Sequence, residues 1–112
     1  MECIFCKIVE GEIPADFVYE SENVVAFRDI NPQAPTHILV VPRKHIDSVE
    51  VLEDDNVCLM GELIFAAKKV AAKLGISSGY RLIVNNGSDG GQEIDHIHLH
   101  LLAGRKMAWP PG

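Results

Sequence analysis

The sequence has no hydrophobic run long enough to cross a bilayer and no excess of positive charge. Its longest apolar runs, at residues 38–41 and 63–67, are far shorter than the roughly 20 residues of a transmembrane helix. The formal net charge of −6 argues against binding nucleic acid through its backbone, because such binding needs clustered lysine and arginine. We therefore expect no nucleic-acid and no membrane partner. A single phosphate needs no basic surface, since backbone N–H groups and imidazoles can hold it.

Cysteine is scarce, and the N-terminus lacks the features of a secretory signal. The chain has three cysteines, an odd number, and Met1-Glu2-Cys3 has neither the basic nor the apolar segment of a signal peptide. We therefore expect a cytoplasmic protein without a disulfide framework. Cys58 falls in a helical apolar pattern and is predicted to lie in the core. No internal repeat is present, and 112 residues predict one domain over positions 1–112.

Hydrophobic periodicity predicts five strands, one long helix and one short helix. We expect the short helix within residues 4–9 and strands at 17–19, 24–27, 37–41, 80–84 and 97–102. The long helix should bury an apolar stripe, with Asp54 or Asp55 capping its start and Gly75 following its end. The stripe comprises Val57, Met60, Ile64, Ala67, Ala71 and Leu74. These elements predict an α+β fold with a largely antiparallel sheet, whose strand order the sequence leaves open.

Three of the five histidines alternate with apolar residues in the last predicted strand, at His96, His98 and His100. Because strand side chains alternate between faces, we expect the three imidazoles on one surface and the apolar residues against the helix. The outer two would lie about 13 Å apart, which disfavours one metal bound by all three. An imidazole nucleophile with imidazole neighbours fits better, since its pKa near 6.5 leaves it largely unprotonated at neutral pH. A polar strand face that is rich in histidine by chance is the alternative.

The pattern His-φ-His-φ-His-φ-φ, with φ apolar, resembles the signature of the histidine triad (HIT) superfamily. The similarity extends over residues 4–14, 26–32, 35–40, 90–92 and 109–112. The chain looks like the branch of histidine triad nucleotide-binding proteins, which hydrolyse purine nucleoside phosphoramidates and adenylyl-lysine conjugates. The resemblance implies a HIT-like fold that pairs as a homodimer, with a purine nucleoside monophosphate or its phosphoramidate as ligand.

The resemblance also implies roles for individual residues. His98 matches the nucleophile, His96 and His100 match its flanking partners, and His37 matches a fourth, supporting histidine. Asp29 matches the residue that binds the ribose hydroxyls. The remaining nucleotide-binding positions are Phe5, Ile8, Ile13, Phe27 and Ile30 around the base, Asn85 and Gly91 near the α-phosphate, Glu93, and Trp109 in a tail that reaches the partner's site. For the apolar positions, ordinary core packing is an equal alternative.

Two positions depart from the pattern of the family. Glu93 stands where some members carry a serine that assists the leaving nitrogen, and Ala108 stands where some carry histidine. The first departure puts the serine's role in doubt for this chain, since a carboxyl group would have to replace it or would favour cationic substrates.

The Cys3-x-x-Cys6 pair is a candidate half of a metal site. A redox pair normally follows a strand and opens a long helix, unlike this one at the N-terminus. The resemblance implies a structural zinc held by Cys3, Cys6, His45 and His96, because some members of the family build such a site. Two unligated thiols are the alternative. We expect no metal to be needed for the chemical step.

Other functions remain open at this stage. Within the superfamily, the alternatives are a dinucleoside polyphosphate hydrolase and a nucleotidyl transferase. His100 argues against the transferase, whose branch carries glutamine there. A non-catalytic purine nucleotide-binding or scaffolding protein would use the same residues as the enzyme.

Overall fold

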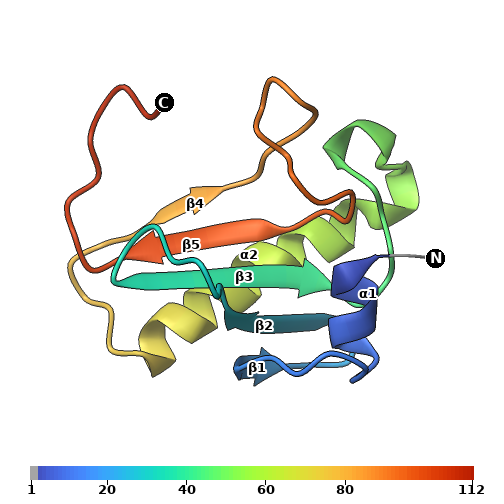
Figure 1. Cartoon of the computed structure of the whole chain (residues 1–112), viewed down its shortest axis with the longest axis horizontal. Coiled ribbons are helices and arrows are strands. Elements are labelled where there is room, and N and C mark those ends of the chain that lie inside the picture. The colour runs from blue at the N-terminus through green and yellow to red at the C-terminus, as the bar shows by residue number, and fades with distance from the viewer. Residues whose placement is uncertain (1–2) are drawn as a thin grey trace.

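The computed structural model describes residues 3–112, so Met1 and Glu2 of the predicted domain lie outside the described residues. Figure 1 shows one sheet with helices on its two faces. The elements are α1 (Ile4–Val9), β1 (Phe17–Glu20), β2 (Val24–Arg28), β3 (Thr36–Pro42), α2 (Val57–Lys73), β4 (Arg81–Ile83) and β5 (Leu99–Ala103), with 3₁₀ turns at Val49–Val51 and Asp54–Asn56. The predicted α+β fold, with five antiparallel strands, one long helix and one short helix, is confirmed.

The sheet has the order β1-β2-β3-β5-β4, which places the two histidine-bearing segments beside each other. β3 pairs with β5 in a register that sets Leu39 opposite His100 and His37 opposite Leu102. Residues two apart on a strand share a face, so His37 and His100 are diagonal neighbours on the same face. The pairing of β3 with β5 therefore brings together side chains that are distant in sequence.

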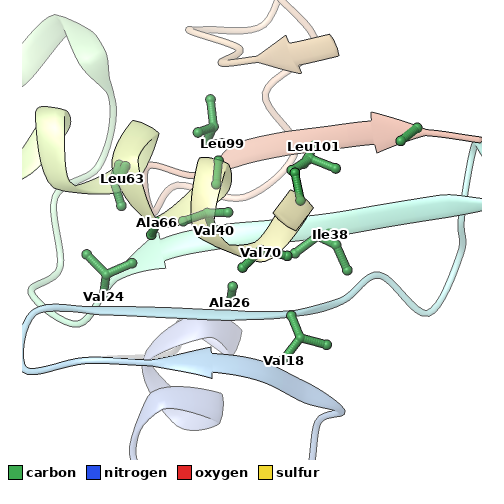
Figure 2. Close-up of a cluster of buried hydrophobic side chains, with 13 residues drawn as sticks. Val18, Val24, Ala26, Ile38, Val40, Leu63, Ala66, Val70, Leu99 and Leu101 are labelled. Atoms are coloured by element: carbon green, nitrogen blue, oxygen red, sulfur yellow. The ribbon is translucent and has the colours of Figure 1, made fainter. Parts of the chain in front are cut away.

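Alternation along β2 and β3 divides the core into two layers. One layer, drawn in Figure 2, packs against α2 and includes Val24, Ala26, Ile38 and Val40. The residues between them, Val25, Phe27, Leu39 and Val41, pack on the opposite face with Phe5 and Ile8 of α1. Because α1 is short, it covers only part of this second face. The remainder of that face is available for a site.

The ends of α2 are fixed by local hydrogen bonds. Gly75 follows the helix with φ of 72°, as predicted, and the N–H of Ile76 donates to the carbonyl of Ala71 at 2.9 Å. At the start, the prediction of a cap by Asp54 or Asp55 was wrong. The N–H of Glu53 instead donates to Oδ1 of Asn56 at 3.1 Å, so the capping box precedes the helix by one 3₁₀ turn.

The buried face of α2 matches the predicted stripe in part, since Ala67 and Ala71 are buried and Met60 and Leu74 pack against the core. The buried residues are Leu63, Ala66, Ala67, Val70 and Ala71, whereas Val57 and Ile64 are 69% and 55% exposed. Cys58 is also exposed, so its placement in the core was wrong. The sheet packs against the face with three alanines, because small side chains allow a helix to approach closely. Apolar residues at helical spacing form two overlapping stripes on α2, one with Leu63 and one with Ile64. Sequence periodicity fits both, and only packing against the sheet selects the one that is buried.

The last strand also differs from its prediction. It begins at Leu99, and His96 to His98 lie before it. The apolar residues Ile97, Leu99 and Leu101 are buried as expected, but His96 and His98 are buried too, at 0% and 7% exposure. The expected surface row of three imidazoles was therefore wrong. Outside the ladder, the backbone can direct neighbouring side chains to different sites.

No helix among residues 3–112 combines the length and the apolar character needed to span a bilayer.

Adjacent positions on α2 test the observed helix face. Leu63 is 1% exposed, so Leu63→Ala should lower the free energy of unfolding by about 2–5 kcal/mol, the usual range for a buried leucine. The matched control Ile64→Ala should change it by no more than about 0.5 kcal/mol. Urea unfolding at constant m-value measures both. Equal losses of unfolding free energy in the two variants would contradict the observed rotation of α2 about its axis.

Candidate active site and metal centre

A cavity of about 560 Å³ opens on the face of the sheet that α1 covers in part. Its lining contains His37 and all but one of the predicted nucleotide-binding residues. They are Phe5, Ile8, Ile13, Phe27, Asp29, Ile30, Asn85, Gly91, Glu93, His98 and His100. The cavity is therefore apolar on the α1 side and carries imidazole, carboxylate and amide groups elsewhere, a composition typical of sites for small amphipathic molecules.

His98 is held in one tautomer by its own backbone neighbourhood. Its Nδ1 lies 2.8 Å from the carbonyl oxygen of His96. A carbonyl oxygen can only accept, so Nδ1 carries the proton and Nε2 keeps its lone pair. The edge of the Phe5 ring packs against the imidazole, with centroids 5.1 Å apart. The structure thus presents at the cavity a buried imidazole whose neutral form carries its lone pair on Nε2, the tautomer that can act as a nucleophile there.

His37 and His100 form a second pair with defined protonation. The N–H of Gln33 donates to Nδ1 of His37 at 3.1 Å, which leaves the proton of His37 on Nε2. That nitrogen lies 2.9 Å from Nδ1 of His100, so His37 donates to it. Neutral His100 then carries its own proton on Nε2. The pair orders His100 as a hydrogen-bond donor.

Burial keeps this pair uncharged. Desolvation lowers the pKa of His37, although the nearby Asp29 carboxylate opposes the shift. Desolvation, together with the neighbouring imidazoles of His98 and His37, lowers the pKa of His100 to about 4. At neutral pH, His100 therefore donates a hydrogen bond without carrying a full positive charge.

Asp29 lies at the edge of this pair. Its Oδ2 is 3.4 Å from Nε2 of His37, and its Oδ1 accepts the N–H of Asn31 at 2.8 Å. Asp29, His37 and His100 are close enough to share a metal ion. However, Nδ1 of His37 already accepts the Gln33 N–H, so Nε2 holds the proton and has no lone pair to offer. The hydrogen bonds favour an imidazole relay at this position over a metal site.

The glycine-rich loop after β4 supplies the other polar groups. Gly91 adopts φ of 85°, and a side chain at Gly90 would collide with the backbone oxygen of Asn86. Nδ2 of Asn85 donates to the carbonyl of Gly91 at 3.5 Å. The loop thereby brings Asn85, Gly91 and Glu93 to the cavity from one side.

A second group of side chains, two thiols and two imidazoles, comes together at the start of α1. Sγ of Cys3 is 3.4 Å from Nδ1 of His96, and Sγ of Cys6 is 3.3 Å from Nδ1 of His45 and 3.6 Å from that of His96. Tetrahedral zinc, with bonds near 2.3 Å to sulfur and 2.0–2.1 Å to nitrogen, requires ligand atoms about 3.5 Å apart. These three distances match that spacing, and all four ligand atoms lie within 4.8 Å of one another, so the side chains fit a Cys₂His₂ zinc centre.

Hydrogen bonds orient both imidazoles of this cluster as ligands. Nε2 of His45 lies 2.6 Å from Oδ1 of Asp47, and Nε2 of His96 lies 2.9 Å from the carbonyl oxygen of Pro42. Both Nε2 atoms are therefore donors, and both Nδ1 atoms turn a lone pair toward the thiols. Burial lowers the pKa of His96, which keeps that ring neutral as a ligand must be. These contacts support a structural zinc.

Burial and the adjacent Cys3 raise the pKa of the Cys6 thiol to about 11 in the metal-free protein. Both thiols lie on the first turn of α1, where the N–H of Cys6 donates to Sγ of Cys3 at 3.4 Å. Coordination to a divalent cation removes thiol protons despite such a shift. Metal binding here is therefore coupled to proton release.

The structure divides the predicted triad between the two sites. The ring of His96 lies in the thiol cluster and is absent from the described lining of the cavity. His96 contributes to the cavity through its backbone carbonyl, which orients the ring of His98. Trp109 is 81% exposed, with its ring 6.0 Å from the Arg81 guanidinium, and it does not line the cavity either.

Sequence reasoning missed several groups that complete both sites. Gln33, Leu39 and Ile94 also line the cavity, and Asp47 holds the ligand His45. Asp47 follows His45 by two residues, and a carboxylate so close to a candidate ligand was a usable signal. The backbone donors and acceptors of Gln33, Pro42 and His96 leave no such signal in sequence.

Several known proteins are similar to this chain in sequence and in fold. The HIT domain profile matches residues 10–107. A HIT family hydrolase from Legionella pneumophila superposes with a TM-score of 0.96 and 55% identity, covering 99% of this chain and 100% of that chain. The 14 kDa zinc-binding protein of Zea mays is 50% identical over 97% of this chain and 87% of its own length. A histidine triad nucleotide-binding protein from Candida albicans gives a TM-score of 0.80 at 33% identity, covering 97% and 83% of the two chains.

Elemental analysis tests the metal centre directly. Protein purified without chelator should contain about one zinc per chain, and Cys6→Ser should remove it. The substitution should also lower the free energy of unfolding by about 2–4 kcal/mol, because the metal ties α1 to the rest of the fold. Cys58→Ser is the matched control, since that thiol is exposed and distant from the cluster in sequence, and it should keep the metal. Wild-type protein without metal would refute the assignment.

Proposed function

The chain belongs to the HIT family, and on this basis we propose that it hydrolyses the P–N bond of purine nucleoside phosphoramidates. Substrates of this class include adenosine 5′-monophosphoramidate and adenylyl-lysine, and the product is the nucleoside monophosphate. The observation that carries the proposal is the fixed tautomer of His98, whose Nδ1 lies 2.8 Å from the His96 carbonyl, so that the neutral ring carries its lone pair on Nε2. This arrangement supports turnover, because it gives the cavity a nitrogen nucleophile as well as groups that bind.

In the proposed complex, the purine nucleotide lies with its base against the apolar residues and its phosphate beside the histidines. A purine base occupies the apolar part formed by Phe5, Ile8, Ile13, Phe27 and Ile30. The ribose hydroxyls bond to the Asp29 carboxylate, which can accept two hydrogen bonds. The α-phosphate then lies between His98, the Nε2–H of His100 and the loop that carries Asn85 and Gly91.

Nε2 of His98 attacks the α-phosphorus, and the P–N bond to the amine breaks. The amine leaves with the bonding electron pair and takes a proton from a water molecule bound at the Glu93 carboxylate, and the hydroxide left behind regains a proton from solvent. General acid assistance of this kind is worth about 10²–10⁴-fold in rate. The new Nε2–P bond leaves a positive charge on the imidazole, which the hydrogen bond from Nδ1 to the His96 carbonyl stabilises.

Water then attacks the nucleotidyl-histidine. The bond between phosphorus and Nε2 of His98 breaks, Nε2 recovers its electron pair, and the water loses its proton to solvent. His100, held neutral by burial, donates to a phosphate oxygen in both steps. His37 does not contact the phosphate in this scheme. It donates a hydrogen bond to Nδ1 of His100 and so keeps His100 in the tautomer that donates from Nε2. No metal takes part in these steps.

A structural zinc belongs to the proposal through Cys3, Cys6, His45 and His96, as the name of the maize relative supports. When bound, it supplies a cross-link between α1 and the segments before β5, and no Lewis acid chemistry. Thiol ligands of this kind persist in a reducing compartment, which agrees with a cytoplasmic location. The negative net charge agrees with the absence of a nucleic-acid partner.

We also propose that residues 1–112 form one histidine triad domain that acts as a homodimer. β4 forms an edge of the sheet, and α2 exposes Val57, Ile64 and Phe65 at 54–69%. Exposed apolar groups and an open strand edge are surfaces that a second copy can cover. In the dimer, the tail that carries Trp109 would extend to the partner's cavity.

Two other functions use the same cavity. A dinucleoside polyphosphate hydrolase would place a second nucleotide beyond Glu93, where a carboxylate repels phosphate. A purely nucleotide-binding protein would bind the monophosphate without forming a covalent intermediate. Mixing the protein with a phosphoramidate labelled in the nucleotide separates an enzyme from the binding protein, because only an enzyme becomes covalently labelled. Comparing turnover of the phosphoramidate with that of a dinucleoside polyphosphate separates the two enzymes.

Removing the nucleophile tests the mechanism. His98→Asn should lower single-turnover hydrolysis of adenosine 5′-monophosphoramidate by about 10⁴-fold or more, while AMP affinity stays within about threefold. His100→Asn should cost less, since that residue only donates a hydrogen bond. The assay contains chelator to exclude free metal ions. Wild-type turnover by His98→Asn would exclude this nucleophile and favour the binding function.

Light scattering tests the dimer. We expect twice the mass of the chain at micromolar concentration, and removal of residues 109–112 should change the selectivity among leaving amines more than it changes the melting temperature. A monomer would contradict the dimer. Unchanged selectivity in a dimeric truncated protein would contradict only the role of the tail.

A further inference from the structure

We propose that Gln92 is a positioning residue that holds the glycine-rich loop in its phosphate-binding conformation. The inference rests on the proposed function, because it concerns the affinity of the same cavity for a nucleotide phosphate. Gln92 falls within the similarity at residues 90–92, but the resemblance implied no role for it, and it is absent from the described lining of the cavity. Its role follows from what its side-chain amide touches.

The amide of Gln92 bonds to three backbone segments at once. Its Oε1 accepts the N–H of Gly87 at 3.0 Å, across the loop. Its Nε2 donates to the carbonyl oxygens of Asp47 at 2.7 Å and Ile94 at 3.0 Å. Both amide protons and one acceptor site are therefore used, and the geometry demands a group with donors and an acceptor on one planar end.

The loop depends on hydrogen bonds for its shape. Residues 86–91 are exposed and rich in glycine, so the cost in backbone entropy of ordering them is high. Backbone bonds within the loop include the N–H of Gly91 to the carbonyl of Ser88 at 3.0 Å and that of Gln92 to Gly87 at 3.0 Å. These bonds close the turn on itself, whereas two side chains connect it to other parts of the protein. Oδ1 of Asn86 accepts the N–H of Glu50 at 2.9 Å, and Gln92 bonds to the carbonyls of Asp47 and Ile94.

The segment at the other end of this connection is itself well anchored. Oδ1 of Asp47 bonds to the ring of His45, and the carbonyl of Ile46 accepts the N–H of Ile97 at 2.7 Å. Ile97 immediately precedes His98. Gln92 thus relates the loop with Asn85 and Gly91 to the same backbone that positions the nucleophile.

Loss of this connection should affect phosphate binding selectively. The base and ribose positions, around Phe5, Phe27 and Asp29, lie on other elements than the partners to which the Gln92 amide bonds. A loop that samples other conformations would hold the α-phosphate poorly, while a nucleoside without phosphate would bind as before. A general loss of folding would instead weaken both ligands in parallel.

Isothermal titration of AMP and adenosine against full-length protein measures this difference. In Gln92→Ala, we expect the dissociation constant of AMP to rise about tenfold and that of adenosine to change by less than about twofold. Gln92→Glu should be at least as damaging, because a carboxylate would face two carbonyl oxygens. Asn23→Ala is the matched control: its amide also makes two side-chain hydrogen bonds, to Glu62 at 3.1 and 3.3 Å, far from the cavity lining, and should change neither constant.

Amide hydrogen exchange in the wild-type protein tests the contact without any substitution. The Gly87 amide should exchange at least about tenfold more slowly than an unprotected amide, although it lies in an exposed loop. Rapid exchange at Gly87 would overturn the proposal even if neither variant folds.

The outcomes separate this inference from the proposed function. An unchanged ratio of AMP to adenosine affinity in Gln92→Ala, whether both constants move or neither does, would overturn the positioning role. If wild-type protein bound neither ligand, the proposed function would fail, while slow exchange at Gly87 would still establish the contact. A selective loss of AMP affinity supports both.

Discussion

The hydrogen bond from Nδ1 of His98 to the carbonyl of His96 links the chemistry of the cavity to the rest of the molecule. An imidazole that rotates freely, or that exchanges its proton between nitrogens, offers its lone pair to the substrate only part of the time. The bond removes both freedoms, and the packed ring of Phe5 removes the rotation that remains. It depends in turn on the backbone at His96, whose ring is held by the Pro42 carbonyl and lies against the thiols of Cys3 and Cys6.

Burial of uncharged imidazoles determines the electrostatics of the site. A charged His100 would attract phosphate more strongly, but it would be buried beside two other imidazoles, and desolvation lowers its pKa to about 4. The structure instead uses a directed N–H, whose orientation the chain from Gln33 through His37 to His100 fixes. A preorganised donor costs no reorganisation when charge develops on the phosphate oxygens, and it acts without a basic surface. Under the proposed function, this arrangement would let a chain with a net charge of −6 hold an anionic ligand.

The sequence revealed the reactive side chains better than the contacts that make them reactive. His98, the Cys3-x-x-Cys6 pair and the glycine-rich loop have recognisable patterns, and the strands follow from alternation. The tautomers depend on backbone groups of Gln33, Pro42 and His96, which every residue possesses and no pattern marks. The rotation of α2 was missed for a related reason: Ile64 and Leu63 are both apolar, and the sheet selected the face rich in alanine. Side-chain chemistry can be predicted from residue type, whereas orientation requires the tertiary contacts.

The separation of the three histidines shows how one short segment can serve two sites. In a regular strand, alternate side chains share a face, and His96 would lie beside His98 in the cavity. Here β5 begins only at Leu99, and the N–H of Ile97 bonds to the carbonyl of Ile46 rather than to β3. The backbone before the strand is therefore free to turn the ring of His96 toward the thiols while Leu99 and Leu101 keep His100 in register opposite Leu39. A strand that started three residues earlier would unite the imidazoles on one face and would leave the cysteines without their second nitrogen ligand.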